Sequence, residues 1–267
     1  MGISFYWREP DGAETQLGQT SATKVKAYSG LGMAPLEHFL QGLPTQHRQL
    51  HRGMKFRPRV VQLALWDRRA SASAQESRQV ALLAALNPDK GEGTLKIVLN
   101  DGTIRYLDCY VQEGPDFASS DRPRWGGSQF YTVRFVALDP FLYDPDQKSV
   151  SGNFNGSVEV ELTATNSGDM GTYPTITIAG EVQSPRIELD TGEYLYFPSY
   201  TVPAGGQVTI DCQEGTVTLA DGTNGISELA SGSTFFYIPR GSHTLTLTCT
   251  SGTSQVTVAW YDRYLGI

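Results

Sequence analysis

Strict alternation of apolar and polar residues dominates the second half of the chain. Segments such as SVEVEL, TITIAGEV, QVTIDC, HTLTLT and SQVTVAW repeat with a period of two, and turn signals such as PAGG and ADG separate them. Short alternating segments at intervals of about 8–12 residues are typical of a β-sandwich. We therefore expect a β-sandwich in the C-terminal half.

The first half also contains strand patterns. Residues 54–67 and 130–138 alternate as strands do, with Val61, Leu63 and Leu65 on one face of the first. Between them, the sequence NDG at 100–102 separates two further alternating segments, which indicates a β-hairpin. This half is also predicted to be mainly β.

One segment of the first half has a helical pattern. Ser73 and Glu76 match a capping box, in which each side chain binds a free backbone N–H at the start of a helix. The apolar face that follows consists of Val80, Leu83 and Leu86. Asn87-Pro88 is expected to end the helix, because proline disfavours helical geometry in the preceding residue.

Charge is distributed unevenly along the 267 residues. Residues 1–150 carry 18 Lys and Arg against 16 Asp and Glu, whereas residues 151–267 carry 3 against 12. The acidic half would repel phosphates, which argues against binding nucleic acid or an anionic membrane there. Because residues 146–156 are polar and rich in Gly, Ser and Asn, we interpret them as a linker between domains at 1–148 and 149–267.

The cysteines and the N-terminal residues exclude several protein classes. Cys109, Cys212 and Cys249 form no C-x-x-C pair and lie in alternating segments, so buried free thiols are expected rather than a disulfide or zinc framework. The first residues lack the apolar core of a signal peptide, and no segment approaches about 18 uninterrupted apolar residues. We expect a protein folded in a cytoplasm, without a membrane span.

The stretch ALDPFLYDP raises the question of catalysis. Asp139, Asp144 and Asp146 could form an acid/base pair or bind a hard cation. However, a calcium loop needs a glycine that is absent between them, and aspartate before proline commonly begins a turn. A turn is the favoured interpretation, with Phe141 and Tyr143 holding the chain against the first domain.

Two further polar groups could act as sites. His47 and His51 have the spacing of a helical zinc pair, but Arg48 occupies the position of the catalytic glutamate, so a loop or strand edge is favoured. The densest basic stretch could contact nucleic acid, although a strand face or a protein contact is favoured. It comprises Arg48, Arg52, Lys55, Arg57 and Arg59.

An aromatic group in the second half could stack on sugars. It comprises Tyr194, Tyr196, Phe197 and Tyr200. Aromatic residues in strands usually serve packing, and the H-x-N-x-R cluster of galectins is absent. No nucleophile elbow, phosphate loop or dinucleotide fingerprint occurs either. We therefore predict no catalytic, cofactor-binding or metal site.

The ordered set of segments resembles a known family. An F-R-P-R strand, a helix ending in ALNP, the hairpin GTLKIVLNDGTIRYLDCYV and the strand FYTVRFVALDPFLYDP resemble the N-terminal domain of the distal tail protein (Dit) family of long-tailed, non-contractile bacteriophages. GTYPTITIAGEV, GQVTIDCQEGTVTLADG, STFFYIPRGSHTLTL and VTVAWYDRYLGI resemble that family's second domain.

The resemblance implies a structural protein of the virion rather than an enzyme. It implies a β-sandwich with one helix and a hairpin at 1–148, which builds a hexameric ring, and a galectin-like β-sandwich at 149–267. The ring would join the major tail tube protein, the tape-measure protein and tail-tip hub or receptor-binding proteins. DNA would pass through its channel without sequence-specific binding, and assembly would take place in the host cytoplasm.

The alternative is a carbohydrate-binding adhesin or receptor-binding protein that acts through the C-terminal β-sandwich. Some members of the resembled family carry carbohydrate-binding insertions in this part. The C-terminal half has no room for an inserted domain. Receptor recognition is therefore expected to fall to a partner.

Overall fold

Long antiparallel strands make up most of the computed structural model, which describes residues 2–42, 47–117, 128–156 and 158–267. The chain divides into unit 1, comprising Met1–Tyr143 and Leu265–Ile267, and unit 2, comprising Asp144–Tyr264. The domain limits 1–148 and 149–267 remain a prediction. Unit 2 begins earlier than that prediction, and the last three residues group with unit 1.

Unit 1 is built on one antiparallel sheet with the strand order β2-β1-β7-β8-β9-β6-β3, and β10 pairs with β8. Its elements are β1 (Ser4–Arg8), β2 (Glu14–Gln16), β3 (Thr23–Ser29), β4 (Leu36–Gly42), β5 (Gln49–Phe56), β6 (Arg59–Arg68), α1 (Ala72–Ala85), a 3-10 turn η1 (Pro88–Lys90), β7 (Gly93–Val98), β8 (Ile104–Glu113), β9 (Ser128–Ala137) and β10 (Leu142–Tyr143).

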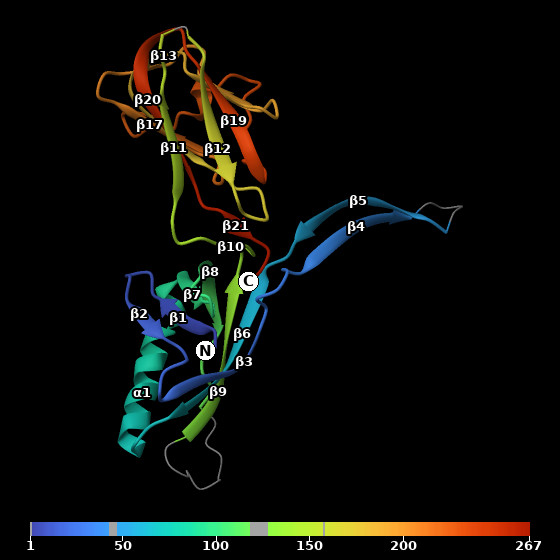
Figure 1. Cartoon of the computed structure of the whole chain (residues 1–267), viewed down its shortest axis with the longest axis vertical. Coiled ribbons are helices and arrows are strands. Elements are labelled where there is room, and N and C mark those ends of the chain that lie inside the picture. The colour runs from blue at the N-terminus through green and yellow to red at the C-terminus, as the bar shows by residue number, and fades with distance from the viewer. Residues whose placement is uncertain (1, 43–46, 118–127, 157) are drawn as a thin grey trace. The chain divides into compact units, whose positions relative to one another are not determined.

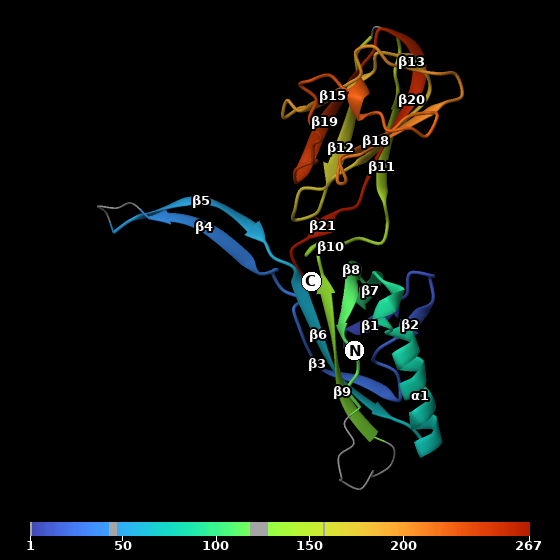
Figure 2. The same cartoon turned by 180° about the vertical axis from the view of Figure 1, so that it is seen from behind.

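Helix α1 lies beside this sheet (Figure 2). Its buried residues include Leu82 and Ala85 near its C-terminal end. The indole N–H of Trp7 on β1 donates a hydrogen bond of 3.0 Å to the carbonyl of Ala85, and the Trp7 ring stacks on Phe135 of β9 at 5.1 Å. Trp7 is 2% exposed and Phe135 is fully buried. This aromatic pair joins β1, β9 and the helix in one core.

Several expectations for unit 1 are confirmed. Residues 130–138 lie on β9, apart from Leu138 just beyond its end, and the NDG turn joins β7 to β8, with Gly102 at a φ of 89°. Val61, Leu63 and Leu65 are fully buried on β6. The expected strand at 54–67 is instead two strands, because Pro58 separates β5 from β6 and lacks the N–H that a ladder requires.

The helix is present, but its predicted start is wrong, and of its predicted apolar face only Leu86 is buried. Its N-cap is Ser71, whose hydroxyl accepts a hydrogen bond of 3.1 Å from the backbone N–H of Ala74, so Ser73 lies inside the helix. Val80 and Leu83 are 68% and 52% exposed. The buried helix residues are Gln75, Leu82 and Ala85, with Leu86 just beyond. The packing of Ala85 against Trp7 fixes this rotation of the helix.

Strands β4 and β5 form a separate two-stranded sheet, which we call the arm, and Figure 1 shows it extending away from the rest of unit 1. Sequence patterning indicated only short strands here. Pro58 is the one sequence signal of a separate sheet, because a proline at this position separates residues 49–56 from the strand that follows.

Unit 2 is a β-sandwich of two antiparallel sheets. One has the order β11-β20-β13-β17-β18 with β16 on β13, and the other has the order β12-β19-β14-β15. Its elements are β11 (Lys148–Asn153), β12 (Val160–Asn166), β13 (Thr175–Gln183), β14 (Arg186–Leu189), β15 (Tyr194–Tyr196), β16 (Thr201–Val202), β17 (Gln207–Asp211), β18 (Thr216–Thr218), a 3-10 turn η3 (Ile226–Glu228), β19 (Gly241–Thr248), β20 (Ser251–Trp260) and β21 (Arg263–Tyr264).

The inward residues of both sheets form the core of unit 2. Ile176, Ile178, Val256 and Val258 come from one sheet, and Leu245 from the other, and all five are fully buried. The expected β-sandwich is thus present. The linker predicted at 146–156 is wrong, because Lys148–Asn153 forms β11 and pairs with β20 along six residues. β11 is an edge strand whose polar residues face outward, and its composition therefore resembles that of a loop.

The three cysteines are free thiols. Cys109 and Cys212 are buried, as predicted, whereas Cys249 is only half-buried. Burial raises the pKa of all three thiols, and that of Cys212 to about 12. They are therefore protonated and poorly nucleophilic at neutral pH.

Arg59 gives the sharpest test of the fold of unit 1. It is 1% exposed, and its guanidinium donates to four backbone carbonyls, those of Gly30 (2.8 Å), Gly32 (2.6 Å), Pro140 (2.6 Å) and Leu265 (2.7 Å). Gly30 has a φ of +87°, and an added Cβ would meet the carbonyl oxygen of Val60 at 2.0 Å, so only glycine fits there.

We expect Arg59→Met to lower the free energy of unfolding of unit 1 by about 3 kcal/mol or more, because buried carbonyls lose their donors. Chemical denaturation monitored by tryptophan fluorescence measures this change. The control is Arg57→Met, which removes an exposed ion pair with Glu37 and should change stability by about 1 kcal/mol or less. Equal effects of the two variants would contradict the structural role of Arg59.

Candidate interaction surfaces

The aspartates of ALDPFLYDP act as hydrogen-bond acceptors. The Asp139 carboxylate accepts from the backbone N–H of Phe141 at 3.3 Å, which is the predicted turn. The Asp144 carboxylate accepts from the hydroxyl of Tyr264 at 2.9 Å. Among the described residues, no group of three or more His, Cys, Asp or Glu side chains could hold a metal ion.

The two aromatic residues of this stretch hold the exit strand of unit 1, as expected. The Phe141 ring contacts Phe56 edge-on at 4.9 Å. The Tyr143 hydroxyl donates to the Asp108 carboxylate at 2.7 Å. Aromatic packing and a partly buried hydrogen bond therefore fix residues 139–143 before the chain leaves unit 1.

His47 and His51 do not share a helix. His51 lies on β5 and His47 precedes that strand, which is the strand-edge interpretation favoured from the sequence. The Nε2 atom of His51 lies 3.1 Å from Nδ1 of His38 on β4. The two rings join the strands of the arm, and the sequence spacing of His47 and His51 gave no sign of this cross-strand pair.

The basic stretch separates into an exposed part and a buried residue. On the arm, Glu37 of β4 accepts from Arg57 at 3.1 Å and lies 3.9 Å from Lys55 of β5. The hydrogen bond from Arg57 lowers the pKa of Glu37. Gln41 accepts from Arg52 at 2.6 Å. Arg59 was predicted within the same basic surface, and the structure corrects this by burying it in unit 1.

The arm exposes large apolar side chains. Phe39, Leu40 and Met54 are 44%, 57% and 56% exposed. An isolated two-stranded hairpin is marginally stable in water, and a sheet of two strands also leaves its backbone edges unpaired. Such an element needs a covering surface. Val80 and Leu83 on α1 form a second exposed apolar pair of unit 1.

The aromatic group of unit 2 is not a free stacking platform. The Arg186 guanidinium lies over the Tyr194 ring at 4.1 Å and 5.9 Å from the centre of the Tyr196 ring. Phe197 is 1% exposed and packs against Tyr200. The packing interpretation favoured from the sequence is confirmed for Phe197, and cation–π contacts occupy the two tyrosines.

One sheet of unit 2 instead carries an ordered row of hydroxyl groups on its outward positions. The row crosses five strands in register, in the order Ser151, Thr257, Thr177, Thr209 and Thr218. The Ser151 and Thr257 hydroxyls lie 2.9 Å apart. This face contrasts with the acidic character of the second half of the chain.

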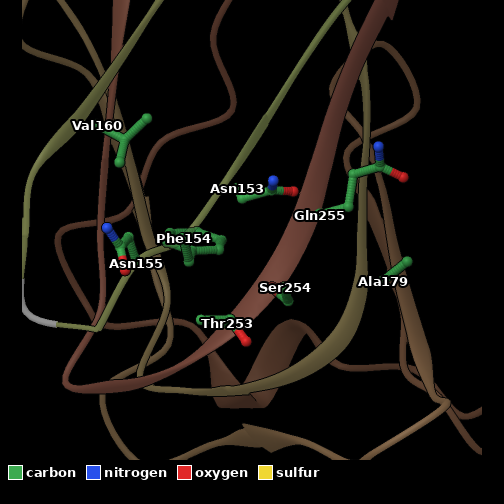
Figure 3. A pocket seen from close by; sticks show the side chains of 8 residues that line it. All are labelled: Asn153, Phe154, Asn155, Val160, Ala179, Thr253, Ser254 and Gln255. Carbon is green, nitrogen blue, oxygen red and sulfur yellow. The ribbon is translucent and has the colours of Figure 1, made fainter.

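A cavity of about 550 Å³ lies at one end of this sheet, and Figure 3 shows the side chains around it. The uncharged lining residues are Asn153, Phe154, Asn155, Val160, Ala179, Thr253, Ser254 and Gln255. Ser254 is 4% exposed, and its hydroxyl has no hydrogen-bond partner among the described residues. No sequence motif marks this site, because the polar residues around Asn153 and Asn155 are typical of a linker.

Comparison with known proteins confirms the resemblance to the distal tail protein family. Residues 167–264 match the family described as siphovirus-type tail component, C-terminal domain. No curated protein matches the chain.

Solved structures share the fold along nearly the whole chain. The Dit protein (gp 19.1) of phage SPP1, described as a paradigm of the hub adsorption apparatus in phages that infect Gram-positive bacteria, matches with a TM-score of 0.72 at 15% identity, over 98% of this chain and 99% of that chain. A chain of the phage P2 baseplate in its activated conformation with Ca matches with a TM-score of 0.52 at 10% identity, over 97% of this chain and 98% of that chain. The mainly β fold class is thereby confirmed.

The helical content adds one finding about membranes. Within the described ranges, no helix has the length and apolar character needed to cross a bilayer.

Replacing Phe141 and Asp139 separates packing from carboxylate chemistry. We expect Phe141→Ala to lower the free energy of unfolding by about 1–3 kcal/mol, because Phe56 loses its aromatic neighbour. Asp139→Asn should leave stability within about 0.5 kcal/mol, since the amide oxygen can accept the same turn hydrogen bond. Thermal unfolding measures both. If Asp139→Asn unfolds the protein, the negative charge itself is required, and the hypothesis of a cation site at this position is favoured again.

Proposed function

We propose that this chain is a structural hub of a long-tailed bacteriophage tail tip. In this proposal, unit 1 of six copies forms a closed ring that joins the tail tube to tail-tip or baseplate proteins and leaves a channel for DNA. The observation that carries the proposal is the likeness of fold to the Dit protein of phage SPP1 along 98% of the chain. The match of residues 167–264 to a siphovirus tail component supports it.

The exposed surfaces of unit 1 support an assembled state. A closed ring uses head-to-tail interfaces, in which one face of a subunit complements a different face of the next. The arm presents Phe39, Leu40 and Met54, and the helix presents Val80 and Leu83. Exposed apolar side chains of this size commonly mark protein contacts. The arm also extends away from the rest of unit 1 (Figure 1).

The partners in this proposal follow from the place of the hub. They are the major tail tube protein, the tape-measure protein and the tail-associated hub or receptor-binding proteins. The chain would act in the virion by contact and geometry, with no catalytic role. Assembly would occur in the host cytoplasm.

Measurement of mass in solution tests the ring. We expect purified protein to form a particle of about six times the 29.2 kDa chain mass, seen by light scattering and as a ring by negative-stain imaging. Leu40→Glu should shift this particle toward monomer, because a buried unpaired charge opposes the contact. The matched control is Ile226→Glu, which places the same charge at a 46% exposed apolar residue of unit 2.

A strict monomer of the unaltered protein at high concentration would argue against a ring that forms without partners. If the Leu40→Glu variant still forms a hexamer, the arm does not contribute to the ring interface, and the proposal of a ring stands without it.

The cavity of unit 2 favours a second candidate function, binding of a neutral glycan. Amide groups of Asn153, Asn155 and Gln255 offer both donors and acceptors to sugar hydroxyls. Phe154 contributes an apolar wall. Uncharged polar groups around an apolar wall suit a neutral ligand better than an ionic one.

A glycan array tests this second function. We expect saturable binding to a neutral glycan that weakens at least tenfold in Gln255→Ala. The matched control is Gln207→Ala, which removes the same side chain from β17 of the same sheet, outside the cavity. An array without any binding would exclude this function, and equal loss in both variants would place binding elsewhere on the sheet.

A further inference from the structure

The arm has two faces of different chemistry. Cross-strand partners in an antiparallel sheet point to the same side, so the register of β4 and β5 assigns each residue to a face. One face, which we call the neutral face, comprises Leu36, His38, Leu40, His51, Met54 and Phe56. The opposite face, which we call the charged face, holds the ion pairs of Glu37 with Lys55 and Arg57.

A histidine pair lies on the neutral face. The register shifts by a bulge between Phe39 and Leu40, and the 3.1 Å contact of His38 Nδ1 with His51 Nε2 shows that the neutral face continues across this bulge. The two ring centres are 5.3 Å apart, so the rings meet through these nitrogen atoms. One nitrogen must carry a hydrogen and the other must accept it. The bond therefore exists only while at least one imidazole is neutral.

The surroundings of this pair offer nothing to balance a second proton. The arm is a separate sheet, and its charged side chains lie on the charged face or before β5. They are Glu37, Arg48, Arg52, Lys55 and Arg57, and His47 also precedes β5. Neither imidazole of the pair has a carboxylate partner among the described residues. His243 differs, because its Nδ1 atom lies 2.9 Å from the Asp190 carboxylate.

Unit 1 carries a second uncharged apolar surface, on the exposed side of α1. This surface comprises Ser77, Val80, Ala81, Leu83 and Ala84, all of which are exposed. Figures 1 and 2 show the arm extending away from the side of unit 1 opposite α1, so the arm leaves the helix of its own chain uncovered. The two surfaces match in chemistry and differ in place, as a head-to-tail contact between copies of one chain requires.

We propose that the neutral face of the arm docks on the exposed side of α1 in the next copy of the ring, and that docking requires an uncharged histidine pair. This inference rests on the hub function proposed above. Docking removes water from the pair, and a buried charge without a partner costs free energy. The docked arm therefore holds fewer protons than the free arm. Acid favours the state with more protons, so it releases the arm.

The mass of the full chain in solution at about pH 7.5 and about pH 5.5 tests the histidine pair, with circular dichroism to verify folding. We expect a ring at the higher pH, and at the lower pH a rise of about tenfold or more in the protein concentration that gives half assembly. The double variant His38→Gln/His51→Gln stays neutral and should remain assembled at both. The control His47→Gln removes a histidine outside the pair and should retain the acid sensitivity.

Mixing of two variants tests the docking surfaces. Met54→Glu charges the neutral face and Val80→Glu charges the helix, and each alone should be a monomer, because a buried unpaired charge opposes the contact. An equal mixture should give heterodimers of about twice 29.2 kDa, since one intact arm meets one intact helix and the ring cannot close. The control Gln41→Glu places the same charge on the charged face, beside Arg52, and should retain the ring.

Three results would overturn this inference and leave the hub proposal standing, because the unaltered ring still forms at about pH 7.5. They are a ring that is equally stable in acid, a double glutamine variant that dissociates in acid as the unaltered protein does, and a mixture that gives no heterodimer. If the unaltered protein forms no ring at the higher pH, the ring proposal fails and this contact fails with it.

Discussion

Unit 1 depends on a single buried guanidinium. Arg59 binds the carbonyls of Gly30, Gly32, Pro140 and Leu265, and so joins the start of β6 to three separate segments. Pro140 lies just before the chain leaves unit 1, and Leu265 is where it returns. Burial lowers the pKa of Arg59, but arginine stays charged in proteins, so all its donors remain available. One residue therefore holds both chain ends that bracket 121 residues of unit 2.

The role of Arg59 was within reach of the sequence but was missed. It sits in a run of basic residues, which favours a solvated face. Yet Arg59 lies two positions before Val61, so it faces the same side of the strand as Val61, Leu63 and Leu65, which are buried. Alternation alone predicts burial at position 59. What could not be predicted is the set of acceptors, because those carbonyls come from residues up to 206 positions away.

Local signals predicted elements better than they predicted orientation. The strands, the NDG hairpin, the helix stop at Asn87-Pro88 and the turn at Asp139 follow from neighbouring residues and are present. The rotation of α1 is set by the contact of Trp7 with Ala85, 78 residues away, so the periodicity of Val80 and Leu83 pointed to the wrong face. The cavity of unit 2 depends on the same kind of distant contact, since it brings Asn153 and Gln255 together, which explains why no motif marks it.

The surfaces of the two units differ in chemistry, and this difference bears on the proposed hub. Unit 1 exposes apolar side chains on an arm and a helix, which gain free energy when another protein covers them. Unit 2 also exposes apolar side chains, such as Ile226 and Tyr237, but one of its sheets presents a row of hydroxyl groups, and this half of the chain is acidic. Small polar groups and net negative charge resist association with like surfaces and with DNA. Assembly through unit 1 would therefore leave unit 2 free to meet ligands or partners of different chemistry.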